Sequence, residues 1–268
     1  MHKSRLFTVL LTITLLSSLC SAALGQTKEP LNTGYDNDNP VPSPYTAVIS
    51  ATSNTNDNYW INIASYPPTL PPAPAPSWVL KYPGLPWALA LPKTNWISAR
   101  PTVGSPGTVS DPAYTIFRKC FCMLQAYTQP ALTFTVRADD TVQVWFNTQL
   151  NVALPASDGH YNTTVLNSLP SNPNWFRPGS NCIYVLVENL GGWMGFDMEG
   201  IIQAYGLMPG AAEGAAQQFA CPCTSGPNGP KPPLTGRGTV TGDDEVVNAL
   251  KQIAERRRLA RIQQRPPQ

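Results

Sequence analysis

Residues able to carry acid–base or nucleophilic chemistry are sparse in this sequence. His160 is the only histidine beyond the first two residues, and it lies in the polar stretch Ser-Asp-Gly-His at 157–160. A Ser-His-Asp mechanism would have to use His160, but no Gly-x-Ser-x-Gly nucleophile elbow accompanies it. We therefore interpret it as a loop residue. A metal site built from several histidines is excluded within one chain.

Paired carboxylates are the second kind of candidate, because glycoside hydrolysis needs two of them about 5–10 Å apart in a cleft. Asp139 and Asp140 follow an alternating strand pattern, where Asp commonly hydrogen-bonds to backbone groups. A structural turn is therefore favoured over a catalytic pair, and no catalytic residues are assigned. Glu188 and Glu199 lie in predicted strands and are expected to be either paired or facing solvent. The other carboxylates of the central region are Asp158 and Asp197.

Five cysteines follow residue 25: Cys120, Cys122, Cys182, Cys221 and Cys223. The two Cys-x-Cys pairs lack the two intervening residues usual for zinc ligands, so we expect disulfides and no metal site. Cys120 and Cys122 share a strand face and are not expected to bond each other. One of them is expected to pair with Cys221 or Cys223, leaving Cys182 as a buried free thiol. Pairing of Cys182 with Cys120 or Cys122 is the alternative.

Tryptophans are the third kind of candidate, because an exposed indole can stack on the C–H face of a sugar ring. Trp175 and Trp193 lie beside turn residues and are expected to be the most exposed. They flank one strand and so lie at its opposite ends, which means that they do not form one site. Trp193 is favoured, because the adjacent Gly191-Gly192 lets a ligand approach the backbone closely.

The predicted ligand site combines Trp193 with three polar side chains at the same end of the predicted strands. Asp139 and Asp140 would accept hydrogen bonds from sugar hydroxyls while the indole stacks on the ring, and Asn189 completes the set. The alternative is structural: Trp193 caps the core, and the polar residues only hold the turn.

Four segments predict the elements that would position this site. Residues 132–138 and 142–147 alternate apolar and polar side chains, which is typical of strands with one buried face. Residues 182–189 are almost all apolar, which fits a central strand covered on both faces. Residues 194–204 are the predicted partner strand.

The order of these features resembles the galactose-binding-domain-like β-sandwich of secreted, mostly bacterial proteins of uncharacterised function. The resemblance covers roughly residues 60–206 and implies an antiparallel β-sandwich of jelly-roll type. Thr148 departs from it, since that family usually has Gly there. A structural calcium ion would match some members, but no residues here identify its site, so no cofactor is assigned. The matching residues are Ala138-Asp139-Asp140, Phe146-Asn147, Phe176, Gly179, Asn181, Val185-Leu186-Val187, Asn189 and Gly191-Gly192.

Residues 1–25 have the three parts of a secretory signal peptide. A basic start containing Lys3 and Arg5 precedes the apolar run 6–19, and small residues at 23–25 offer a cleavage site. The run is too short to be a membrane anchor, and no later stretch would span a bilayer. We expect a protein secreted to the extracellular space or the periplasm, where disulfides form.

Composition limits the class of partner. Lys and Arg number 18 against 16 Asp and Glu, so loss of Lys3 and Arg5 leaves 16 of each. This neutral chain has no broad basic field, which argues against nucleic acid as a partner. Charged residues make up 13%, about half the usual ~25%. The 29 prolines fit loops, edges and linkers better than long helices.

The predicted organisation is a signal peptide (1–25), a polar leader (26–45), the β-sandwich domain (46–208), a Gly/Pro/Cys linker (209–241) and a basic helical tail (242–268). Val246, Leu250 and Ile253 share one helix face, but Arg257 then enters that stripe. The tail helix is expected to dock weakly on the sandwich, to bind a protein partner, or to fray. Its deletion is expected to leave the sandwich folded.

Fold class alone does not choose a function. The leading hypothesis is a secreted, non-catalytic binding module for carbohydrate, with a glycan or another cell-surface component as partner. A structural or protein-interaction component of the cell surface or extracellular matrix is the alternative. A hydrolase is the third and least favoured class.

Overall fold

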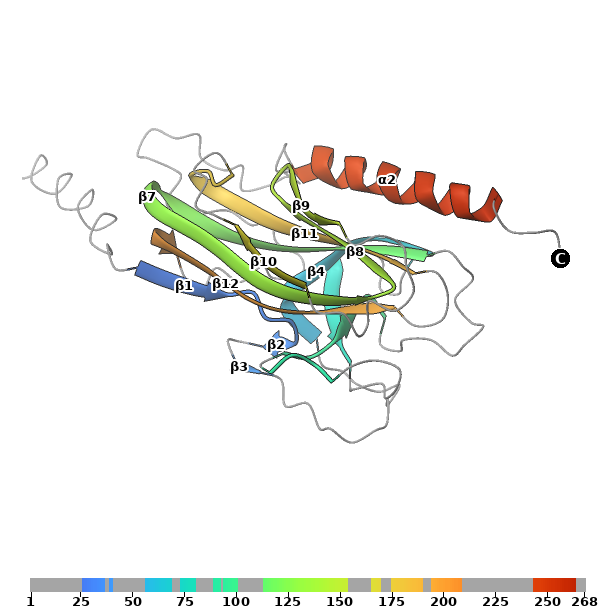
Figure 1. Ribbon diagram of the computed structural model, residues 1–268, viewed down its shortest axis with the longest axis horizontal. Coiled ribbons are helices and arrows are strands. Elements are labelled where there is room, and N and C mark those ends of the chain that lie inside the picture. Colours follow the sequence, from blue (N-terminus) through green and yellow to red (C-terminus); the bar gives the residue numbers. More distant parts are fainter. Residues whose placement is uncertain are drawn as a thin grey trace, which may run out of the picture.

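The computed structural model describes residues 26–36, 39–40, 56–68, 73–80, 89–92, 94–100, 113–153, 165–169, 175–189, 194–208 and 243–263. In these residues the fold is mainly antiparallel β sheet with a C-terminal helix, α2 (Asp243–Gln263), which confirms the predicted class (Figure 1). No helix of this described part is long and apolar enough to cross a membrane. The strands are β1 (Gln26–Pro30), β2 (Tyr35–Asp36), β3 (Asn39–Pro40), β4 (Asn56–Tyr66), β5 (Ala75–Val79), β6 (Ile97–Ser98), β7 (Ala113–Asp139), β8 (Thr141–Phe146), β9 (Gln149–Ala153), β10 (Val165–Leu169), β11 (Gly179–Asn189) and β12 (Gly195–Met208).

The long strand β7 organises the sheet. Its first half pairs with β4 and β11, and its second half pairs with β10 and β12. The sequence patterns predicted separate strands at 114–122 and 132–138, but the backbone remains in one 27-residue strand. Gln129 has a φ of 50°, and the pairing with β12 shifts register on either side of Tyr205. These irregularities let one strand bend between the two layers, as Figure 1 shows at the end where β7 is labelled.

The main core lies between the two layers of strands. Val142, Val144 and Phe146 are all fully buried in it, which confirms the strand face predicted from their alternation. Aromatic rings fill much of the space, with Trp60 edge-on to Phe196 at 5.2 Å between ring centroids. Offset and edge-to-face arrangements of this kind are the favoured geometries of buried aromatic pairs.

The strand β11 is covered on both faces, as its apolar sequence predicted. Ile183, Val185 and Val187 belong to the main core. The alternating residues Tyr184 and Leu186 belong to a second buried cluster that also contains residues of α2. We call this side of β8, β11, β7 and β4 the outer face.

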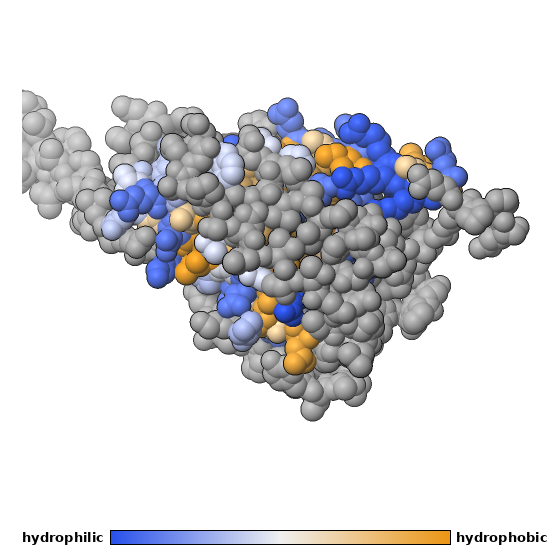
Figure 2. Space-filling model, in the orientation of Figure 1, coloured by the Kyte–Doolittle hydropathy of each residue, from blue (hydrophilic) through white to orange (hydrophobic). Residues whose placement is uncertain are grey.

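The helix α2 docks on the outer face through a narrow apolar stripe. Leu250 and Ala254 are each 1% exposed, and Val246 and Ile253 are partly buried beside them. In Figure 1 the helix runs along one side of the sheet. The docked arrangement agrees with the first of the three expectations for the tail. Hydrophilic residues gather along α2 in Figure 2, interrupted by hydrophobic patches, and its exposed large apolar side chains are Leu259 and Ile262.

The N-terminal segment, expected to be an extended polar leader, is extended and is also part of the sheet. Strand β1 pairs with β12 in the register Gln26 to Tyr205. Leu31 is fully buried, and its backbone N–H donates to the Gly200 carbonyl at 2.9 Å. The segment at 46–49, predicted to be a strand, lies outside the described residues.

The disulfide Cys120–Cys182 corrects the expectation that Cys182 is a free thiol. The two residues are directly paired between β7 and β11, with Cα atoms 4.1 Å apart. Pairing across adjacent strands brings their side chains to one face, and the one-dimensional pattern of cysteines could not supply that register. Cys122 is also disulfide-bonded, not to Cys120, and its partner lies outside the described residues. Its pairing with Cys221 or Cys223 stays a prediction, since both also lie outside them.

Candidate ligand-binding edge

Strand pairing brings three of the four predicted ligand residues to the same end of the strands, which forms one rim of the sheet. Asp139 is the last residue of β7, Asp140 connects it to β8, and Asn189 is the last residue of β11. The Asp140 backbone N–H donates to the Glu188 carbonyl at 3.2 Å, which ties the turn to the end of β11. We call Asp139, Asp140 and Asn189 the ligand edge.

The fourth predicted residue, Trp193, lies outside the described residues, but both ends of its segment are placed. Asn189 precedes the segment, and Gly195, which follows it, pairs with Asp139. Its sequence neighbour Met194 is buried in the main core. The five residues that connect β11 to β12 therefore start and finish at the ligand edge.

The side chains of the ligand edge are largely buried. Asp139 is 6% exposed, Asp140 9% and Asn189 0%. Each has an interaction partner within the chain, as buried polar groups require. The peptide bond between Asp139 and Asp140 is cis. A ligand would therefore meet only the small accessible part of the two aspartates.

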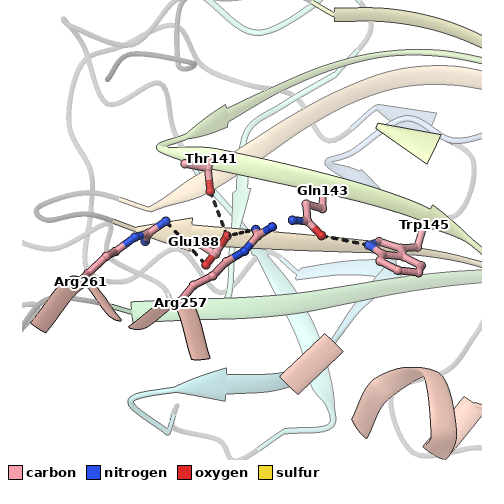
Figure 3. Close-up of polar contacts among 6 residues, drawn as sticks. All are labelled: Thr141, Gln143, Trp145, Glu188, Arg257 and Arg261. Atoms are coloured by element: carbon pink, nitrogen blue, oxygen red, sulfur yellow. Dashed lines mark hydrogen bonds and ion pairs between the residues drawn. The ribbon is translucent and has the colours of Figure 1, made fainter. Parts of the chain in front are cut away.

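Glu188 lies next to this edge but points to the outer face. Its carboxylate, 3% exposed, accepts a hydrogen bond from Arg257 at 2.7 Å and lies 3.7 Å from the Arg261 guanidinium (Figure 3). The Thr141 hydroxyl donates to the same carboxylate at 3.4 Å. Glu188 is thus paired, one of the two outcomes left open by the sequence. Arg257, which interrupts the apolar stripe of the helix, was the sequence signal for this pairing.

Asp197 is a structural carboxylate, a role that the sequence did not reveal. It accepts hydrogen bonds from the backbone N–H of Leu91 at 2.7 Å, from the Thr33 hydroxyl at 3.2 Å and from the Thr94 hydroxyl. Burial raises the pKa of Asp197 to about 6, although these hydrogen bonds and the charge of Arg137 oppose the rise. Asp197 therefore fastens the N-terminal segment and residues 91–94 to β12.

The opposite end of β11 is occupied by a network that fixes a loop. Asn181 accepts from the Arg177 backbone N–H at 3.0 Å and donates to the carbonyls of Arg177 and Gly179. Asn147 donates to Asn181 at 3.1 Å and to the Trp175 carbonyl at 2.8 Å. Trp175, expected to be exposed, is half-buried against the main core. The residues that carry the family resemblance at this end therefore serve the fold.

The remaining predicted chemistry adds no second site in the described part. His160 and Asp158 lie outside it, and Glu199 is half-buried on β12. No group of three or more His, Cys, Asp or Glu side chains that could hold a metal ion occurs among the described residues.

Comparison with known proteins gives few similarities. No family model and no curated protein sequence matches the chain. Among solved structures, a β-glucosidase from Kluyveromyces marxianus in complex with glucose is similar at 11% identity and a TM-score of 0.27, with 38% of this chain and 12% of that chain covered. The PA14 domain of the antifreeze protein MpAFP is similar at 14% identity and a TM-score of 0.24, with 41% and 48% covered. This chain thus spans less than half of either structure.

Proposed function

We propose that the protein is a secreted, non-catalytic module that binds neutral carbohydrate at the ligand edge. The observation that carries this proposal is the meeting of Asp139, Asp140 and Asn189 where the Trp193 segment begins and ends. Carboxylate oxygens accept hydrogen bonds from sugar hydroxyls, and an indole offers an apolar face for the ring. The edge is held by the pairing of Glu188 with Thr141 and of Asp139 with Gly195, so its oxygens need little reorganisation on binding.

Some members of the resembling family hold a structural calcium ion, and the ligand edge carries oxygen donors. Calcium prefers oxygen ligands, which carboxylates and side-chain amides supply. Asp139 and Asp140 would hold the ion, with Asn189 as a neutral donor. When bound, calcium would supply positive charge that attracts sugar hydroxyl oxygens.

Tryptophan fluorescence tests the proposal directly. The protein, lacking residues 1–25, is titrated with neutral mono- and oligosaccharides in the presence of calcium and then of a chelator. We expect a saturable change that Trp193→Ala and Asp140→Asn each reduce at least about tenfold in affinity. Glu199→Gln is the matched control, because it removes a carboxylate from β12 away from the edge. Unchanged binding by a folded Trp193→Ala variant would show that the indole is not the platform.

A protein-interaction role is the second candidate, favoured by the outward side of α2. Leu259 and Ile262 are 46% and 44% exposed one turn apart, although the other side of the helix is docked. Exposed apolar side chains of this kind contribute to protein interfaces. Sedimentation of the protein alone, compared with a Leu259→Ser/Ile262→Ser variant, tests whether this surface joins two copies. We expect a monomer in both if carbohydrate binding is the main role.

A further inference from the structure

The last turns of α2 contact a row of side chains that crosses four strands of the outer face. Thr141, Glu188, Tyr114 and Tyr66 are successive partners across β8, β11, β7 and β4. Arg257 and Arg261 pair with Glu188 in this row, and the Arg258 guanidinium lies 4.3 Å from the centre of the Tyr66 ring. The C-terminal half of the helix is thus held by charge and aromatic contacts at one end of the outer face.

The Cys120–Cys182 disulfide lies on the same face, further along β11. Cys182 and Glu188 are six residues apart, an even number, so their side chains point to one side and are separated by about 20 Å. Leu250 and Ala254 belong to the same buried cluster as the disulfide. A single helix therefore contacts the Glu188 row and packs in the buried cluster that contains the bridge.

Burial makes this disulfide inaccessible in the docked state. Cys120 is 4% exposed and Cys182 is 0% exposed. The bridge joins two strands of the sheet, and on the outer face it belongs to the buried cluster that also contains Leu250 and Ala254 of α2. Thiol–disulfide exchange requires a thiolate to reach a bridge sulfur, so access decides the rate.

We propose that α2 is a cover that gates chemical reduction of the Cys120–Cys182 bridge, with the Glu188 pairing as its latch. A dithiol reaches the bridge only from states in which the helix has left the sheet. One thiolate of the reductant attacks a bridge sulfur and releases the other cysteine as a thiolate. The second thiolate of the reductant then attacks the reductant sulfur of this mixed disulfide and releases the remaining cysteine as a thiolate. The reductant becomes a cyclic disulfide, and the bridge gains two electrons and two protons as Cys120 and Cys182 thiols.

The latch, which is the pairing of Glu188 with Arg257 and Arg261, sets how often the helix leaves the sheet. Glu188 is buried, so loss of both arginines would leave its charge without a nearby partner while the helix stays docked. Undocking would then expose the carboxylate to water, which favours the open state. Removing the latch should therefore raise the population of open helix without altering any residue of the main core.

The test measures alkylation of Cys120 and Cys182 by mass spectrometry during exposure of the folded protein to dithiothreitol. In Arg257→Ala/Arg261→Ala the two thiols should appear about tenfold faster, or more, than in the wild type. Leu259→Ala/Ile262→Ala is the control, because both side chains point outward from the same helix, and its rate should match the wild type. Equal rates in the wild type and the double arginine variant would overturn the proposal.

A wild-type experiment covers the case in which the arginine variant loses its fold. Urea is increased to concentrations that stay below the unfolding transition of the sheet. At each concentration, the rate of bridge reduction is measured together with hydrogen exchange of the backbone amides of α2 and of β11. The proposal requires reduction to rise in step with exchange of α2 while β11 stays protected. Reduction that rises only when β11 exchanges would show that the sheet, and not the helix, limits access.

Discussion

At the residue scale, Asn147 and Asn181 show which structural property lies behind the family resemblance. Asn147 has a φ of 50°, in the left-handed region that Asn tolerates better than most residues. In this turn the positive φ is adopted by Asn147. Thr148 can therefore occupy the position where the resembling family usually has Gly. Asn181, near the start of β11, then completes four hydrogen bonds. These residues specify a turn, which is why they predict a fold and not a ligand.

Replacement of Asn181 with Ala should destabilise the protein by about 2–4 kcal/mol, because it leaves buried donors and acceptors without partners. Urea unfolding measures this loss as a lower midpoint with an unchanged slope. Ser180→Ala is the neighbouring control, since the half-exposed Ser180 side chain takes no part in this network, and its effect should stay below about 0.5 kcal/mol. A loss of similar size in both variants would contradict the role assigned to Asn181.

Asp197 gives the chain a stability that depends on pH in a definite direction. Its pKa is about 6 in the folded protein against 3.8 for an ordinary Asp, so the folded state binds more protons between these values. The contribution of Asp197 to the free energy of unfolding is full below pH ~4 and is lost as pH rises through 6. The loss amounts to about 3 kcal/mol, at 1.36 kcal/mol per pKa unit.

The wild type and Asp197→Asn, unfolded by denaturant from pH 4 to pH 7, test this direction. Asn can still accept from the Leu91 N–H and cannot ionise. The free energy of unfolding of the wild type should therefore fall relative to the variant as pH rises. A constant difference between the two proteins, or one that grows in the wild type's favour, would refute the burial argument.

At the scale of elements, period-two alternation predicted β8 and the second half of β7 correctly because each has a buried face, and the nearly continuous apolar run predicted β11 because both of its faces are covered. The sequence did not show that residues 113–139 form one strand, since Gln129-Pro130 at the bend indicates a break between two strands. It also missed the sheet pairing of β1, whose polar residues lie at an edge. Register between distant strands, which set the Cys120–Cys182 bridge, is a tertiary property.

Deletion of residues 243–268 should preserve a cooperative unfolding transition with a lower midpoint. No residue of α2 belongs to the main core, so the sandwich keeps its principal cluster. The deletion uncovers the second cluster and removes both partners of Glu188, which should cost about 2–4 kcal/mol. Thermal melts followed by near-ultraviolet circular dichroism measure both quantities, with Ile262→Ser as a control of unchanged midpoint. Loss of the cooperative transition would show that the helix is required for the sandwich itself.

At the scale of the whole molecule, two features of the chain lie on opposite faces of one strand. Asn189, in the ligand edge, ends β11 beside the main core, whereas Glu188 points to α2. The sequence predicted that Asp139, Asp140 and Asn189 meet, because strand ends joined by short turns lie together. It could not predict how deeply they are buried, because burial depends on segments remote in sequence.

A glycan-array screen of the protein without residues 1–25 tests the proposed function most directly. The wild type and Glu199→Gln should retain the same set of neutral glycans, and Asp139→Asn/Asp140→Asn should lose at least about nine-tenths of that signal while remaining folded. Absence of any glycan signal from the folded wild type would contradict carbohydrate binding. Full retention by the double variant would contradict the ligand edge as its site.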